Sequence, residues 1–158
     1  MASDKIMACA PLIVAKGLKI AFVESATAGW LASEFSLVPE SGKILLGGII
    51  VYDADPKTEI FGISKETIEQ YTAESAEVTK LLADGLGRYF KCDIAVAITG
   101  LTTPGGSETP EKPVGTIFIH ILLEGRHCPY REVFTGRAED IIKQTIDKVG
   151  IHLSSLLG

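Results

Sequence analysis

Three side chains in the first half of the chain could form a hydrolytic centre: Ser25, Tyr52 and Lys57. Ser25 directly follows the apolar run 19–24 and opens the small, polar segment Ser-Ala-Thr-Ala-Gly. A serine at a strand-to-helix turn can face a ligand together with backbone N–H groups, which can hold an oxyanion or a phosphate. Judged on spacing alone, however, Ser25 or Thr27 is more simply explained as the N-cap of a helix.

A serine nucleophile needs a base, and the three histidines are poorly placed to supply one. His120 stands mid-strand among Ile and Phe, His127 in an expected turn and His152 on the last helix, so no Ser-His-Asp triad is expected. Lys57 could act instead if desolvation keeps its amine neutral, with Tyr52 relaying the proton or orienting the serine. Without further information, the simpler interpretation is a solvated lysine and a strand aromatic.

A third candidate segment is the glycine-rich stretch 99–107, which follows an apolar run and continues to Lys-Pro-Val-Gly-Thr at 112–116. Glycines such as Gly100, Gly105 and Gly106 let backbone amides approach a phosphate, because no Cβ stands in the way. The segment matches neither the Walker P-loop nor the dinucleotide fingerprint. A ligand-binding loop and a plain surface loop both remain open, although loops this long inside a domain are usually functional.

The pattern of apolar runs and caps predicts alternating strands and helices. Strands are expected at 19–24, 44–52, 93–98, 114–123 and 130–134, and helices at 3–16, 30–36, from 55, from 64, from 75 and at 138–157. We therefore predict one α/β domain over residues 1–158, a three-layer α/β/α sandwich with a mixed five- to six-stranded sheet. Arg137, at the turn before the last helix, could pair with a phosphate or be an ordinary surface charge.

Several glycines and prolines allow more specific predictions of local structure. Pro11 predicts a kink or a late start in the first helix. The pair Gly47-Gly48 predicts a bulge or a close approach within its strand. Residues 39–42 read as a loop, and Gly125 with Pro129 is expected to bracket the connection of an antiparallel strand pair.

Composition excludes several classes of protein. Of 158 residues 46% are hydrophobic, and 15 basic against 20 acidic residues give a net charge of -5, so no nucleic-acid partner is expected. No apolar run is long enough to cross a membrane. The cysteines are Cys9, Cys92 and Cys128, an odd number without metal spacing, which predicts free thiols and neither a disulfide framework nor a zinc site. A cytoplasmic protein is expected.

Taken together, the segments resemble the C-terminal domain of the competence/damage-inducible protein CinA, which also occurs alone as nicotinamide mononucleotide deamidase. The family's Glu-Ser-x-Thr-Gly-Gly appears here as residues 24–29, and its Gly-Gly-x-x-x-Tyr strand followed by a lysine appears as 47–52 and Lys57. Its Thr-Gly-x-Ala-Gly-Pro-x-Gly-Gly motif is matched by the eight residues 99–106, one position short of the motif, and its Lys-Pro-Val-Gly-Thr motif appears as 112–116. The resemblance runs over essentially the whole chain.

The resemblance implies an amidohydrolase that converts nicotinamide mononucleotide to nicotinate mononucleotide and ammonia, with Ser25, Tyr52 and Lys57 as catalytic residues. The turn after Ser25 would stabilise the oxyanion, and the 99–106 loop with Arg137 would hold ribose and phosphate. Substrate contacts are expected at Thr27, Gly29, Gly48, Thr99, Gly100, Gly105, Gly106 and Arg137. No cofactor and no metal are expected, and a homo-oligomer, with a dimer favoured, is implied.

The chain departs from the family pattern at identifiable places. Ala28 replaces the first glycine of the Gly-Gly pair, Thr102-Thr103 replace Ala-Gly in the loop, and Lys143 stands where the last helix usually has a second arginine. Two other functions therefore stay open: a nucleotide-binding or regulatory protein without turnover, and an amidohydrolase that acts on another small amide.

Overall fold

The central strand of the fold is β1, which lies between two parallel neighbours. The computed structural model describes residues 2–158, and its single sheet has the strand order β2-β1-β3-β4-β5. The strands are β1 (Ile20–Glu24), β2 (Leu45–Ile50), β3 (Ile94–Gly100), β4 (Thr116–Leu123) and β5 (Arg126–Val133). β1 pairs in parallel with β2 and β3, whereas β4 is antiparallel to both β3 and β5. The predicted mixed sheet is confirmed, with five strands.

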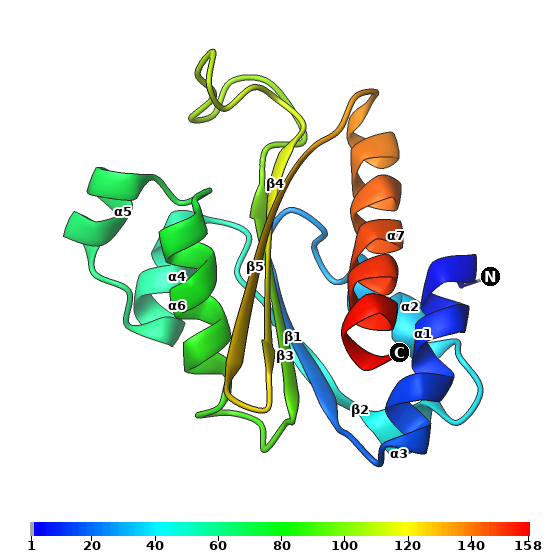
Figure 1. Cartoon of the computed structure of the whole chain (residues 1–158). Coiled ribbons are helices and arrows are strands. Elements are labelled where there is room, and N and C mark those ends of the chain that lie inside the picture. The colour runs from blue at the N-terminus through cyan, green and yellow to red at the C-terminus, as the bar shows by residue number, and fades with distance from the viewer. Residues whose placement is uncertain (1) are drawn as a thin grey trace.

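Helices cover both faces of this sheet, as Figure 1 shows. One layer holds α1 (Asp4–Ala15), α2 (Trp30–Ser36), α3 (Ser41–Ile44) and α7 (Ala138–Leu157), and the other holds α4 (Ala54–Phe61), α5 (Lys65–Tyr71) and α6 (Ala76–Leu86). Because both faces are covered, every residue of β1 is buried, and so is nearly all of β3. The predicted three-layer α/β/α arrangement is confirmed.

Side-chain caps define where several helices begin. The Ser75 hydroxyl accepts a hydrogen bond from the Val78 amide, as predicted for the start of α6. Ser3 caps α1 in the same way, and that helix begins at Asp4. Of the kink or late start that Pro11 predicts, the late start is wrong, because the proline lies inside a helix that begins at Asp4, and the kink stays a prediction.

The edge strand β2 contains the bulge that its glycine pair predicted. The register with β1 shifts between Ile20 and Ala21, which pair with Leu45 and Gly47 respectively. Gly47 has a φ of 146°. A Cβ on Gly48 would stand 3.2 Å from the Phe22 carbonyl oxygen. The two glycines thus let β2 curve closely against the buried strand.

Two predicted boundaries are wrong. Pro129 lies inside β5, opposite His120, and does not end a turn. This is tolerated because β5 is an edge strand, where a missing N–H can face solvent. The predicted loop at 39–42 is also incorrect in part, because the short helix α3 begins at Ser41. The antiparallel pairing of β4 with β5 is confirmed.

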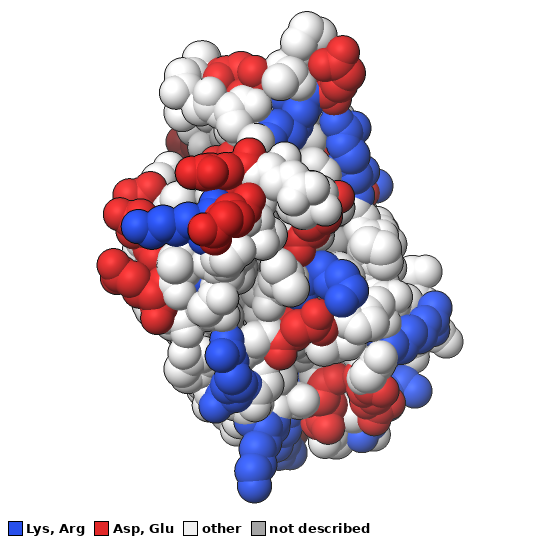
Figure 2. All heavy atoms as spheres, turned by 90° about the vertical axis from the view of Figure 1, so that its left-hand side faces the viewer, with Lys and Arg blue, Asp and Glu red and all other residues white. Residues whose placement is uncertain are grey.

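The surface and the thiols add little specific chemistry. Figure 2 shows acidic and basic side chains intermixed over the face that α4, α5 and α6 form. No helix within residues 2–158 combines the length and apolarity needed to span a bilayer. Cys9, Cys92 and Cys128 are free, as predicted, and burial raises the pKa of Cys9 to about 12. Over the same residues, no three side chains of the metal-ligating types cluster.

Candidate active site

The hydroxyl of Ser25 and the amine of Lys57 lie within hydrogen-bond distance of each other. Lys57 Nζ stands 3.1 Å from Ser25 Oγ, and both side chains are buried, with exposed fractions of 5% for Ser25 and 1% for Lys57. The two residues are 32 positions apart in the sequence. The structure therefore brings together the proposed nucleophile and the proposed base.

Parallel pairing of β1 with β2 explains why these two residues meet. The Val51 amide donates to the Glu24 carbonyl at 2.9 Å, so the ladder continues to the last residue of β1. Ser25 then leaves β1 at the same edge of the sheet where the chain leaves β2 toward α4. Asp53 caps α4 through the Ala54 amide, and this places Lys57 in the first turns of that helix, facing the sheet.

Burial changes the chemistry of the lysine. Removal from water lowers the pKa of Lys57, because the charged ammonium loses its hydration. The carboxylates of Glu74 and Asp53 oppose this shift but do not reverse it. An amine of this kind loses its proton more readily than a solvated lysine and can act as a base.

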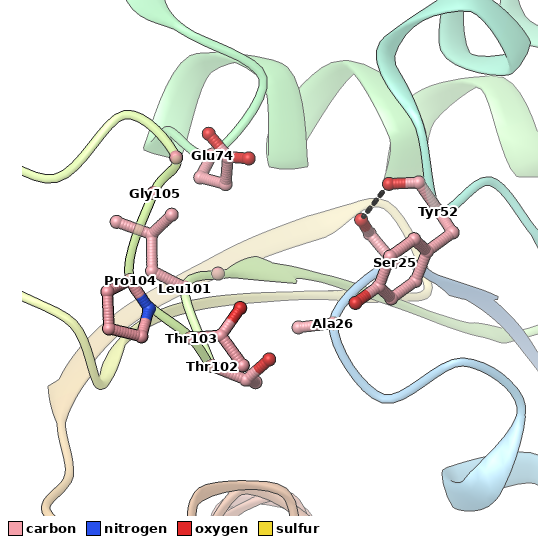
Figure 3. Close-up of a pocket in the computed structure, with 11 residues that line it drawn as sticks. Ser25, Ala26, Tyr52, Glu74, Leu101, Thr102, Thr103, Pro104 and Gly105 are labelled. Atoms are coloured by element: carbon pink, nitrogen blue, oxygen red, sulfur yellow. Dashed lines mark hydrogen bonds between the residues drawn. The ribbon is translucent and has the colours of Figure 1, made fainter. Parts of the chain in front are cut away.

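Backbone carbonyls hold the amine in place. Lys57 Nζ donates to Val51 O at 2.7 Å and to Asp53 O at 3.1 Å, and it lies 3.4 Å from Tyr52 O. Ser25 Oγ in turn donates to Tyr52 O at 3.3 Å, the contact drawn in Figure 3. Lys57 Nζ also donates to Ser25 Oγ, so a neutral amine, with two N–H donors and one lone pair, would have to turn its lone pair toward Ser25 Oγ to accept the hydroxyl proton.

The carboxylate of Glu24 organises the turn that follows Ser25. It accepts hydrogen bonds from four donors: Thr27 Oγ1 at 2.5 Å, Gly29 N at 2.9 Å, Leu31 N at 3.2 Å and Ala32 N at 2.8 Å. The first amides of α2 are thus occupied by a carboxylate of the protein itself. The start of α2 is closed to a substrate phosphate for this reason.

Two amides of the turn remain available for an oxyanion. The Ser25 amide donates to Ile98 O and the Ala28 amide to Ser25 O, both at 3.0 Å. Within the described chain, the amides of Ala26 and Thr27 have no hydrogen-bond partner. Of the turn expected to stabilise an oxyanion, these two amides are the ones still free to donate.

A cavity of about 190 Å³ opens beside Ser25, as Figure 3 shows. The predicted site residues that line it are Ser25, Tyr52, Gly100, Gly105 and Gly106. Its other lining residues are Ala26, Glu74, Leu101, Thr102, Thr103 and Pro104. The glycine-rich loop and the serine turn therefore form two walls of one cavity.

The other predicted substrate contacts lie outside this cavity. The hydroxyl of Thr27 binds Glu24, and that of buried Thr99 lies 2.8 Å from Thr79 Oγ1. Gly29 donates its amide to Glu24, and Gly48 packs against Phe22. The side chain of Arg137 is 87% exposed and lies beside Asp140 at the start of α7. That helix start points to the same end of the molecule as the 101–115 loop (Figure 1).

Comparison with known proteins places this arrangement in a family. The family model described as the CinA C-terminal domain matches residues 4–157. The chain belongs to the CinA C-terminal domain family. A putative competence-damage inducible protein of Clostridioides difficile is 33% identical over 153 residues, covering 94% of this chain and 36% of its own length. A CinA-like protein of Thermotoga maritima is 39% identical over 117 residues, covering 74% of this chain and 28% of its own.

This CinA-family chain thus spans about a third of the length of these curated relatives. Solved structures cover it almost completely. A CinA superfamily protein of Klebsiella pneumoniae has a TM-score of 0.91 at 24% identity, with 98% of this chain and 96% of that chain covered. A competence/damage-inducible protein of Agrobacterium tumefaciens has a TM-score of 0.89 at 24% identity, with 100% and 99% covered. At these identities the structural likeness shows the fold alone.

One departure from the family motif has a visible backbone consequence. Ala28 has a φ of 49°, the left-handed region that glycine adopts more easily. The chain therefore carries a Cβ at a position whose conformation favours the glycine of the family motif. Gly29, next to it, has a φ of 93°, and a Cβ there would meet Ile50 Cδ1 at 2.8 Å.

Tyr52 enters this CinA-family site mainly through its backbone. Its carbonyl oxygen contacts both Ser25 Oγ and Lys57 Nζ. Its side chain lines the cavity and is 63% exposed, and its hydroxyl has no hydrogen bond to any residue described. The phenol is therefore placed to touch a ligand, whereas the carbonyl contacts the Ser25 hydroxyl and the Lys57 amine.

Sequence reasoning missed Glu74, which lines the same cavity. The sequence predicts a helix from residue 75, and a residue just before a helix carries no motif of its own. The signal was available only from the fold, because β3 and α6 bring the α5–α6 turn over the cavity. The three histidines lie elsewhere: His120 and His127 bond each other at 2.9 Å, and His152 stacks on Tyr130.

Proposed function

We propose that the protein is a serine amidohydrolase that converts nicotinamide mononucleotide to nicotinate mononucleotide and ammonia. One observation carries the proposal: a buried Lys57 amine, with a lowered pKa, lies 3.1 Å from the Ser25 hydroxyl at the wall of a cavity. Membership of the CinA family, together with the matched Ser25, Tyr52 and Lys57 positions, supports the choice of substrate.

In the proposed first step, Ser25 Oγ attacks the carboxamide carbon while neutral Lys57 takes the hydroxyl proton. The Ala26 and Thr27 amides face the developing oxyanion. Lys57, now an ammonium, gives its proton to the leaving nitrogen as the C–N bond breaks, so ammonia departs and an acyl-enzyme remains. Water then attacks the acyl carbon while Lys57 takes one of its protons. The bond from the acyl carbon to Ser25 Oγ breaks, Lys57 returns the proton to Oγ, and the carboxylate product leaves.

The decisive measurement is ammonia release from nicotinamide mononucleotide. The wild type should release ammonia, and Ser25→Ala should lose at least about 10²-fold in kcat, since the nucleophile is absent. Ser33→Ala, an exposed serine on α2, is the matched control and should keep the wild-type rate. Equal rates for Ser25→Ala and wild type would exclude Ser25 as the nucleophile.

A second candidate substrate class follows from the lining of the cavity. Among the described residues that line it there is no Lys or Arg, and Arg137 lies outside. This favours a small amide without a phosphate, and a panel of amides with and without phosphate would separate the two. Calorimetric binding of the mononucleotide with no ammonia release from any amide would instead favour a binding protein without turnover.

A further inference from the structure

Glu74 gives the cavity a charge that the proposed reaction does not use. Among the described residues that line the cavity, Glu74 alone carries a charge at neutral pH. In Figure 3 its carboxylate lies across the cavity from Ser25, on the turn between α5 and α6. A carboxylate across the cavity from Ser25 adds a negative charge that a ligand in the cavity would meet.

The backbone at Glu74 is held from several directions. Its carbonyl oxygen accepts from Thr72 Oγ1 and from Lys112 Nζ, both at 2.9 Å. Thr72 itself has a φ of 71°, and the Ser75 hydroxyl donates to the Thr72 carbonyl at 2.9 Å. These contacts fix the turn and place the Glu74 side chain at the cavity.

The carboxylate makes no direct ion pair within the described part of the chain, although Lys112 lies nearby: burial lowers the pKa of Lys112, and the Glu74 charge opposes that lowering. Ser107 Oγ donates to Glu74 Oε2 at 2.6 Å, whereas Oε1 has no partner among the described residues. Lys112 contacts the Glu74 carbonyl and Ser107, and no ion pair of Glu74 is found within residues 2–158. The negative field reaches the reacting pair, since Glu74 opposes the lowering of the Lys57 pKa. A free carboxylate oxygen therefore remains for a ligand.

We propose that Glu74 makes this cavity selective for carboxamides carried on a cationic group, such as a quaternised pyridine ring, over neutral carboxamides. A cation near a half-buried carboxylate gains Coulomb energy that a neutral ring of the same shape does not. The part of the inference that concerns turnover rests on the proposed function. Hydrolysis turns R–CONH₂ and water into R–COO⁻ and NH₄⁺, so Glu74 also repels the new carboxylate and favours its release.

The test compares two amides that differ in ring charge: 1-methylnicotinamide, a cation, and nicotinamide, which is neutral. Dissociation constants are measured by NMR titration on the Ser25→Ala protein, so that turnover does not interfere. The cation should bind about fivefold more tightly, the range expected for one partly exposed charge pair. Adding Glu74→Gln should remove this preference while nicotinamide binds as before, because glutamine still accepts from Ser107.

Two control variants separate charge from loop structure. Ser107→Ala breaks the tie between the loop and Glu74 but keeps the carboxylate, so both amides should weaken together and their ratio should persist. Glu77→Gln removes an exposed carboxylate from the first turn of α6 and should change neither constant. Equal affinity for the two amides in the Ser25→Ala protein, or a preference that survives Glu74→Gln, would overturn the proposal.

These measurements distinguish a failure of the proposed charge preference from a failure of the proposed amidohydrolase activity. A charge preference that depends on Glu74, without ammonia release from any amide by the wild type, would contradict the proposed function and leave the selectivity standing. Ammonia release by the wild type without any charge preference would support the proposed function and contradict the selectivity. In a turnover assay, Glu74→Gln should also lower the inhibition constant of nicotinate mononucleotide, because the repulsion of the product carboxylate is gone.

Discussion

The two walls of the cavity are held by different kinds of interaction. On the Ser25 side, backbone hydrogen bonds from Val51 to Glu24 and from Ser25 to Ile98 extend the sheet directly into the site, and the reacting side chains are buried. On the opposite side, residues 102–106 are exposed or half-buried. That loop is anchored at its base by backbone bonds between Leu101 and its return strand, and near its tip by Lys112.

The difference implies a division of labour. A wall fixed by sheet pairing keeps the Ser25 hydroxyl and the Lys57 amine in position to within a few tenths of an ångström, which the proposed chemistry requires. A wall fixed by a few side-chain contacts can adjust to a ligand at small cost. Changes in the first wall should therefore alter rate and folding stability, and changes in the second should alter affinity.

The largest effect is expected from Lys57→Met, which removes the base but keeps the length of the buried side chain. Activity should fall by about 10²–10⁴-fold, the usual contribution of a general base. The protein should nevertheless unfold at a temperature no lower than wild type at neutral pH, because the desolvation cost of the amine is gone. An ammonia-release assay measures the loss of activity, and thermal unfolding measures the stability. A variant that retains full activity would show that the base is another group.

Glu24→Gln tests whether the first wall depends on its carboxylate. Glutamine keeps one acceptor oxygen and turns an NH₂ toward the donors of Thr27, Gly29, Leu31 and Ala32 that the carboxylate now satisfies. The free energy of unfolding should drop by about 2–4 kcal/mol, as buried charged hydrogen bonds are lost. Urea unfolding measures it, with Glu77→Gln as the exposed control. A change below about 0.5 kcal/mol, the range of surface substitutions, would contradict this role.

The pH dependence of kcat should report Lys57. The neutral amine is the active form, so kcat should rise about tenfold per pH unit up to the pKa of Lys57, which burial lowers. Between that pKa and the ordinary value for lysine, the unfolded chain binds a proton that the folded chain lacks. The free energy of unfolding should therefore rise with pH in this window. Lys57→Met should lack this extra slope when unfolding is followed at several pH values.

Lys112→Met should loosen the second wall. The amine loses its contacts to Thr72, Glu74 and Ser107, so the loop is held mainly at its base. We expect KM to rise about three- to tenfold, equivalent to roughly 1 kcal/mol of binding, with kcat changed less than twofold. Steady-state kinetics check this split. A loss in kcat that exceeds the rise in KM would show that the loop also positions the reacting pair.

Ala28→Gly should produce the smallest effect of these variants, and it should stabilise the protein. Glycine relieves the left-handed strain at φ 49° but adds freedom to the unfolded chain, so a net stabilisation of about 0.5 kcal/mol is expected. Gly29→Ala is the opposing change and should destabilise, because its Cβ would meet Ile50. A comparison of the two melting temperatures tests whether strain in this turn is confined to Ala28.

Local sequence signals predicted most elements of the fold. The helices at 30–36 and 138–157 were placed at their observed bounds, because apolar spacing and the residues at their ends agree. The sequence signal is weaker where strand pairing determines whether a residue lies in a strand or in a turn. Pro129 looked like a turn residue, and only its place on the edge strand β5 lets it stay within the sheet.

In the candidate site, too, the sequence predicts some features and only the fold creates others. Residue types and the family resemblance singled out Ser25, Lys57 and the glycines of the loop, all of which lie at or beside the cavity. They did not show that Glu24 already occupies the start of α2, or that the Tyr52 carbonyl contacts the reacting pair. Such contacts depend on backbone groups, which every residue carries and no sequence pattern distinguishes.

The sequence by itself determined the order along the chain of the strands and of every helix but α3, because hydrophobic periodicity and caps act within a few residues. It also supplied the serine, the lysine and the glycine loop. Only the tertiary structure decided that the lysine is dehydrated beside the hydroxyl and that Glu74 faces them. Both depend on segments far apart in the chain meeting at one edge of the sheet, and the pKa of an amine is set by what surrounds it in space.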